Sequence, residues 1–118
     1  MPDREGLPAF DLVLLGMGSD GHTASIFPDQ MQLLSTDNIC DVGVHSKSGQ
    51  NRITLTGNVI NNAHLVYFMV TGAEKAEIVA SIIDGRPGRE KYPAAHINPI
   101  HGTLTWFLDD SAATILKK

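Results

Sequence analysis

The sequence has little of what marks several protein classes. Its 118 residues include a single cysteine, Cys40, which excludes an internal disulfide and a cysteine-based zinc site. No apolar run approaches the roughly 20 residues that a membrane-spanning helix needs. The first residues lack the basic-then-apolar profile of a secretory signal. These absences predict a cytosolic protein without a membrane partner.

An excess of basic charge is also missing. Nine lysines and arginines stand against thirteen aspartates and glutamates, for a net charge of -4. No basic stripe interleaved with aromatic residues indicates nucleic-acid binding, and no block of like charge indicates a disordered tail. Four of the histidines lack the spacing of metal ligands and are interpreted as surface or packing residues: His45, His64, His96 and His101. We therefore expect neither a nucleic-acid partner nor a metal.

Short apolar runs alternate with helical patterns along the chain, which is long enough for one domain over residues 1–118. Residues 12–15 and 65–70 indicate buried strands, and further strands are predicted at 39–44, 52–56 and 104–108. Helices are predicted at 23–26, at 59–63 after an N-cap at Thr56, at 74–84 and at 111–116. Strands separated by helices predict an α/β fold with a parallel sheet covered on both faces.

The strand 12–15 leads into a loop that combines glycines with a possible acid-base pair. The glycines are Gly16, Gly18 and Gly21, and among them stand Asp20 and His22. Loops at the carboxyl ends of strands in open α/β sheets bind ligands, and a histidine beside a carboxylate suits general-base catalysis near neutral pH. A glycine-rich turn with a helix-capping aspartate and a solvated histidine is the structural alternative.

The same glycines also fit the Gly-x-Gly-x-x-Gly fingerprint of dinucleotide-binding folds. That motif needs a full-length helix after the third glycine and an acidic residue at the end of the next strand. Here Pro28 ends the expected helix early, because proline cannot continue one. Asp37 and Asp41 lie near the required distance without ending an apolar strand. The dinucleotide interpretation is therefore weak.

Two basic residues matter because of where the predicted topology places them. Lys75 falls in the first turn of the helix after strand 65–70, where a cation opposes the helix dipole. Parallel strands would bring it to the same sheet edge as His22, where it could bind phosphate. Pairing with Glu74 or Glu77 is the alternative. Arg52 begins its strand, so topology alone sends it to the opposite edge as a surface residue.

Several segments together resemble the 6-phosphogluconolactonases, the cytosolic lactone hydrolases of the oxidative pentose phosphate pathway. Residues 10–28 resemble the signature of that family, residues 52–63 its arginine-bearing segment, 70–75 its lysine-bearing segment and 102–109 its closing strand. The resemblance runs from about residue 8 to residue 116 in the family's order. It implies a three-layer, Rossmann-like parallel sheet flanked by helices, with this chain as the C-terminal half.

The resemblance also implies roles for the residues that match. His22 would be the general base that takes a proton from water, and Asp20 would orient its imidazole. Arg52 and Lys75 would hold the 6-phosphate of the lactone, and neither a metal nor an organic cofactor would take part. Three glycines would let the backbone approach the sugar: Gly16, Gly18 and Gly21.

The chain departs from the family at two points. Gly57 stands where relatives often have a proline. More importantly, the family's leading strands, glycine-rich phosphate loop and active-site arginine have no counterpart, which implies pairing with an N-terminal half or self-association.

Two other functions stay open at this point. Glucosamine-6-phosphate deaminases share the fold and the Asp-Gly-His loop, but theirs continues into an Asn-Glu pair where this chain has Ser25, Ile26 and Phe27. A non-catalytic module that binds sugar phosphates, or pairs with another chain, is the second alternative.

Overall fold

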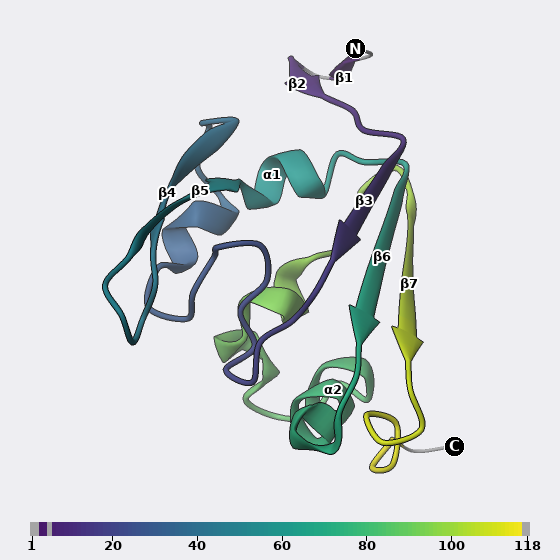
Figure 1. The fold of residues 1–118 in the computed structure, drawn as a ribbon. Helices are drawn as coiled ribbons and strands as arrows, with labels where there is room; N and C mark the ends of the chain where they lie inside the picture. The colour runs from purple at the N-terminus through teal and green to yellow at the C-terminus, as the bar shows by residue number, and fades with distance from the viewer. Residues whose placement is uncertain (1–2, 5, 117–118) are drawn as a thin grey trace.

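A three-stranded parallel sheet organises the molecule. The computed structural model describes residues 3–4 and 6–116 (Figure 1). The sheet contains β3 (Leu12–Leu15), β6 (Leu65–Val70) and β7 (Thr103–Leu108), in the order β3-β6-β7. Both strand pairs are parallel, with Leu15 opposite Phe68 and Phe68 opposite Trp106. The predicted α/β class is confirmed.

Helices cover one face of this sheet. They are α1 (Gly57–Ile60), α2 (Ala76–Ile83) and the 3-10 turns η1 (Met31–Leu34), η2 (Ala73–Lys75), η3 (Arg89–Lys91) and η4 (Pro93–His96). Alternate strand residues such as Val13, Val66 and Phe68 enter the core, together with Val79 of α2. Phe68 stacks on Trp106 with ring centroids 4.1 Å apart. In the described part of the chain, no helix combines the length and apolar character needed to cross a membrane.

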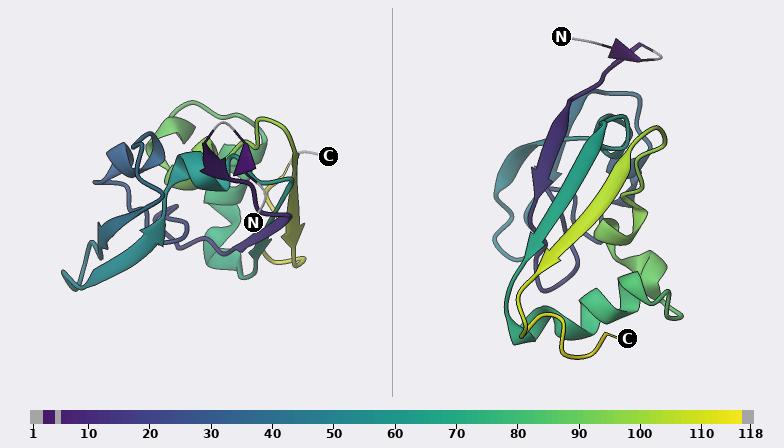
Figure 2. Two further views of the ribbon diagram at one scale, coloured as in Figure 1. Left: turned by 90° about the horizontal axis from the view of Figure 1, so that it is seen from above. Right: turned by 90° about the vertical axis from the view of Figure 1, so that its right-hand side faces the viewer.

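The opposite face of the sheet is apolar and uncovered by the described residues. Strand alternation points Leu12, Leu14, Met69 and Phe107 to this side, where they are 43%, 59%, 58% and 48% exposed. The right-hand view of Figure 2 shows the strands in front and the helices behind them. The described residues thus supply one of the two covering layers predicted from the strand-helix alternation.

Two antiparallel hairpins lie outside the parallel sheet. One pairs β1 (Asp3–Arg4) with β2 (Leu7–Pro8). The other pairs β4 (Cys40–Val44) with β5 (Asn51–Leu55), so the strands predicted at 39–44 and 52–56 exist but do not join the main sheet. The Ser25 N–H donates to Thr54 Oγ1 at 3.0 Å, and Gly43 lies so close to the Ser25 carbonyl that a side chain there would collide with it. The second hairpin is therefore anchored on the glycine-rich loop.

Two helices predicted from the sequence are wrong. Residues 23–26 form a turn closed by a bridge between Thr23 and Ile26, because Thr23 is used to tie the loop back to the Gly16 carbonyl at 2.8 Å. Residues 111–116 form turns instead of a helix. Asp109 still caps the first of these turns, since its carboxylate accepts the Ala112 N–H at 2.8 Å.

The helix predicted at residues 59–63 exists as α1, but the expected cap does not. The Thr56 side chain makes no capping hydrogen bond to α1. Its hydroxyl donates to the Asn38 carbonyl at 2.7 Å, which ties α1 to the segment that precedes β4. The position therefore serves tertiary structure more than local helix initiation.

Candidate active site

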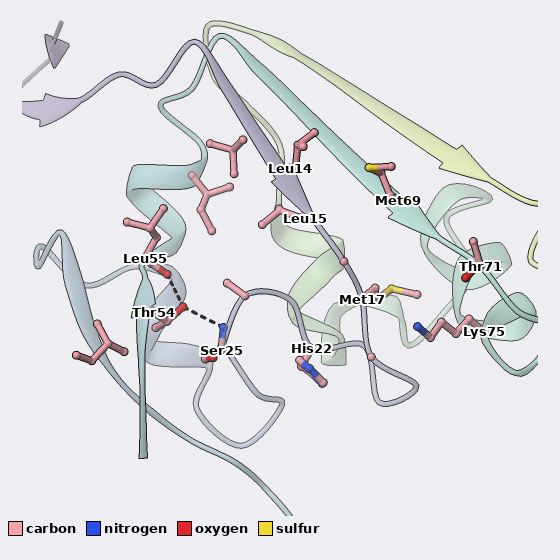
Figure 3. A pocket seen from close by; sticks show the side chains of 16 residues that line it. Leu14, Leu15, Met17, His22, Ser25, Thr54, Leu55, Met69, Thr71 and Lys75 are labelled. Atoms are coloured by element: carbon pink, nitrogen blue, oxygen red, sulfur yellow. Dashed lines mark hydrogen bonds between the residues drawn. The ribbon is translucent and has the colours of Figure 1, made fainter. Parts of the chain in front are cut away.

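The carboxyl ends of β3 and β6 open into one cavity. Its volume is about 550 Å³, and its wall includes Gly16, Gly18 and His22 from the loop after β3 and Thr71 and Lys75 from the segment after β6. Residues of the hairpin strand β5 close the other side (Figure 3). The cavity thus lies where parallel-sheet proteins bind their ligands.

His22 is held by Asp20 through two hydrogen bonds. Nδ1 of His22 lies 2.6 Å from Oδ1 of Asp20, and the His22 backbone N–H donates to the same oxygen at 3.0 Å. An ionised carboxylate can only accept, so the neutral imidazole carries its proton on Nδ1 and leaves a lone pair on Nε2. The His22 side chain is 26% exposed. A base of this kind can take a proton from a molecule bound in the cavity.

The electrostatics of Asp20 favour its charged form. Burial acts to raise the pKa of the Asp20 carboxyl, but the His22 backbone N–H, the hydrogen bond with the imidazole and the attraction of that ring together bring the pKa below its ordinary value. Asp20 is therefore ionised at neutral pH. It can stabilise a positive charge that develops on His22.

Two of the predicted glycines are required for this geometry. A side chain at Gly18 would collide with the His22 ring, and Gly21 has a φ of 85° and lies against Tyr92. Only glycine adopts that φ without strain. At Gly16, in contrast, a Cβ would meet no atom within 4 Å, because the position faces open space. Gly18 therefore makes room for the imidazole, and it also lines the cavity.

The segment between α2 and β7 packs against the glycine-rich loop that carries His22. The Ala94 N–H donates to the Gly21 carbonyl at 3.0 Å, and the Tyr92 ring packs against Gly21. The sequence pattern of residues 86–99 predicts only a loop. Its prolines and glycines indicate turns but carry no sign of which segment they contact, so sequence reasoning misses these two supporting residues.

Of the two predicted phosphate ligands, one lines the cavity and the other does not. Lys75 lies in η2 and lines the cavity that contains His22, as parallel topology predicted. Figure 3 shows it reaching from the end of β6 toward the glycine-rich loop. Arg52 is exposed on β5, where Nε and Nη2 both lie 3.2 Å from Oε1 of Gln50. It is not among the residues that line the cavity, so the geometry groups Lys75, but not Arg52, with His22.

The chain matches the model of a known protein family. The family model described as glucosamine-6-phosphate isomerases/6-phosphogluconolactonase matches residues 1–106. The chain belongs to this family.

Individual members are similar over most of the chain. A 6-phosphogluconolactonase of Treponema pallidum (strain Nichols) is 50% identical over 82 residues, which cover 70% of this chain and 34% of the relative. One from Synechocystis sp. is 44% identical over 110 residues, covering 93% and 45%. The structure of 6-phosphogluconolactonase from Trypanosoma cruzi superposes with a TM-score of 0.84 at 35% identity, covering 99% and 46%. The chain thus spans less than half the length of each of these relatives.

Proposed function

We propose that this chain supplies the general-base half of a cytosolic 6-phosphogluconolactonase site, which hydrolyses 6-phospho-D-glucono-1,5-lactone to 6-phosphogluconate. The observation that carries the proposal is the Asp20–His22 pair, with its 2.6 Å hydrogen bond, in one cavity with Lys75. The membership of the family supports the same chemistry.

In the proposed reaction, Nε2 of His22 takes a proton from water while the water oxygen attacks the lactone carbonyl carbon. The bond between that carbon and the ring oxygen then breaks, and the His22 imidazolium returns the proton to the leaving oxygen. The new carboxylic acid loses its own proton to solvent. Asp20 stabilises the transient imidazolium, in the way that a buried carboxylate supports a catalytic histidine.

Lys75 is proposed to bind the 6-phosphate. Arg52 does not line the cavity but precedes the lining residue Ile53 on β5, and we propose that its side chain leaves Gln50 and reaches the phosphate as a second ligand. Replacing Lys75 by methionine should raise KM for the phosphorylated lactone about 10-fold to 100-fold, because a hydrogen bond to a charged group is worth about 1.5–3 kcal/mol. Hydrolysis of unphosphorylated gluconolactone should barely change. Steady-state kinetics on both substrates measures the change in KM. Arg52→Met, the variant of the second proposed phosphate ligand, is measured in the same way. Equal losses on both substrates would show damage to the fold instead of a phosphate contact.

The Gly18 position offers a paired test of the histidine geometry. Gly18→Ala should lower turnover about 10²-fold, because its methyl group displaces the His22 ring and small misplacements of a catalytic group are costly. Gly16→Ala, two residues earlier in the same loop, should lower turnover much less, because a Cβ there would meet no protein atom and would leave the His22 ring in place. Circular dichroism checks the fold of both variants. Equal activity of the two would contradict the assigned role of Gly18.

We further propose that the uncovered apolar face and the free edge of β3 are completed by a segment corresponding to the unmatched half of the relatives, or else by a second copy of the chain. No nucleic acid or membrane takes part in the proposed function. Of the described residues that line the cavity, none carries a carboxylate, which disfavours the deaminase alternative with its ring-opening glutamate.

The test is to express this chain with the unmatched part of the Synechocystis relative and to follow acid release from 6-phosphogluconolactone. Glucosamine-6-phosphate serves as the second substrate, and release of ammonia is its readout because deamination releases no acid. The proposal is supported if the lactone is hydrolysed above its spontaneous rate and glucosamine-6-phosphate is not converted. Phosphate-dependent binding without hydrolysis would instead favour the non-catalytic alternative.

A further inference from the structure

Phe27 lies between two histidine rings. Its ring centroid is 4.6 Å from that of His22, with the planes tilted by 35°, and 5.1 Å from that of His45. The Phe27 side chain is fully buried, at 1% exposure, although it comes from the loop that forms the cavity wall. An aromatic ring is thus packed directly against the imidazole that the proposed reaction uses.

The hydrogen bond to Asp20 does not by itself fix the His22 ring. It holds one edge of the imidazole at Nδ1, and the ring plane can still swing about that contact. On one side the ring lies so close to the Gly18 backbone that a Cβ there would collide with Cε1 and Nδ1. The contact with Phe27 supplies a further restraint, because rotation of the imidazole toward Phe27 would have to displace a buried aromatic side chain.

His45 holds Phe27 in place from the other side. Nδ1 of His45 accepts hydrogen bonds from the backbone N–H groups of Lys47 and Ser48, each at 3.2 Å. These two bonds anchor its imidazole to the turn between β4 and β5. That hairpin is itself anchored on Ser25 through Thr54. Phe27 is therefore packed between His45 of the hairpin and His22 of the glycine-rich loop.

We propose that Phe27 is a positioning residue that fixes the plane of the His22 imidazole, with His45 as its support. The catalytic consequence rests on the proposed function, whereas the geometric claim does not.

The geometric claim is tested by NMR on the chain combined with the unmatched half of a relative, because we expect the chain alone to self-associate. We expect nuclear Overhauser contacts between the Phe27 ring protons and the carbon-bound ring protons of His22, which a His22→Gln variant assigns. In Phe27→Leu the His22 ring signals should shift, because the ring current of Phe27 is lost. Phe68→Leu is the matched control, since it removes a buried ring that stacks on Trp106. It should leave the His22 signals in place.

The catalytic claim is tested by kinetics with 6-phosphogluconolactone, on the chain combined with the unmatched half of a relative. Phe27→Leu should lower kcat on the order of 10-fold while KM changes by less than about two-fold, because the imidazole, not the substrate contact, is disturbed. His45→Leu should produce a smaller loss in the same direction.

Each outcome decides a separate question. Absent contacts between the two rings in the unaltered chain, or His22 signals that Phe27→Leu does not move, would overturn the positioning role. Losses of kcat in Phe68→Leu equal to those in Phe27→Leu would do so as well, by showing a general packing effect. If the unaltered protein hydrolyses no lactone, the proposed function fails, while the NMR result still decides whether Phe27 sets the ring plane.

Discussion

Replacing His22 with glutamine is expected to lower hydrolysis of 6-phosphogluconolactone by about 10²–10⁴-fold, the usual contribution of a positioned general base. Glutamine is similar in size and polarity, but its amide cannot take a proton from water at neutral pH. The loss should fall on kcat, because the phosphate contact proposed for Lys75 is untouched. The measurement is acid release by the chain combined with the unmatched half of a relative.

The matched control for this variant is His101→Gln. His101 is exposed just before β7, so its replacement should leave turnover unchanged, and circular dichroism should be the same for both variants. Turnover by His22→Gln that stays near the unaltered level, well above the spontaneous rate, would show that another group activates the water.

The second large effect concerns the chain by itself. Attack on the lactone carbonyl develops negative charge on an oxygen, and a preorganised donor for such a charge is worth about 3–4 kcal/mol, or about 10²–10³ in rate. The described residues of the cavity offer Lys75, which is assigned to the phosphate. We therefore expect the 118-residue chain alone to be feebly active, with activity rising at least about 10²-fold when the unmatched half of a relative is added.

The same chain should self-associate in solution when it is alone. Its uncovered sheet face presents Leu12 and Phe107 to solvent, and β3 forms an open sheet edge. Exposed apolar faces and unpaired edges are normally covered in stable single domains. Sedimentation velocity should show species larger than a monomer, and fewer of them in Leu12→Lys and Phe107→Lys. A stable, fully active monomer would contradict both expectations.

The parts of the fold that were predictable are those in which local pattern and global topology agree. The runs at residues 12–15 and 65–70 could be predicted as strands because their residues are all apolar, as in strands of parallel sheets. In the described part of the chain, alternate residues of both strands are exposed or half-buried. The meeting of His22 and Lys75 follows from strand direction alone, since parallel strands end at the same edge.

The rest depends on contacts that no local pattern records. Thr23 ties the loop back to Gly16 instead of continuing a helix, and Tyr92 reaches Gly21 from a distant segment. The hairpin carrying Arg52 leaves the parallel sheet altogether. Each outcome is set by specific contacts between side chains and backbone of different segments, which override local propensity.

The pairing of β3 with β6 fixes the distance between the groups that follow these two strands. The register that sets Leu15 opposite Phe68 also sets how far Lys75 stands from His22. A slip of two residues, the smallest that keeps each strand's core side chains inward, would move one group by about 6.6 Å relative to the other. Under the proposed function, the spacing between the phosphate contact and the general base is therefore set by the backbone hydrogen bonds of the sheet as well as by the two side chains.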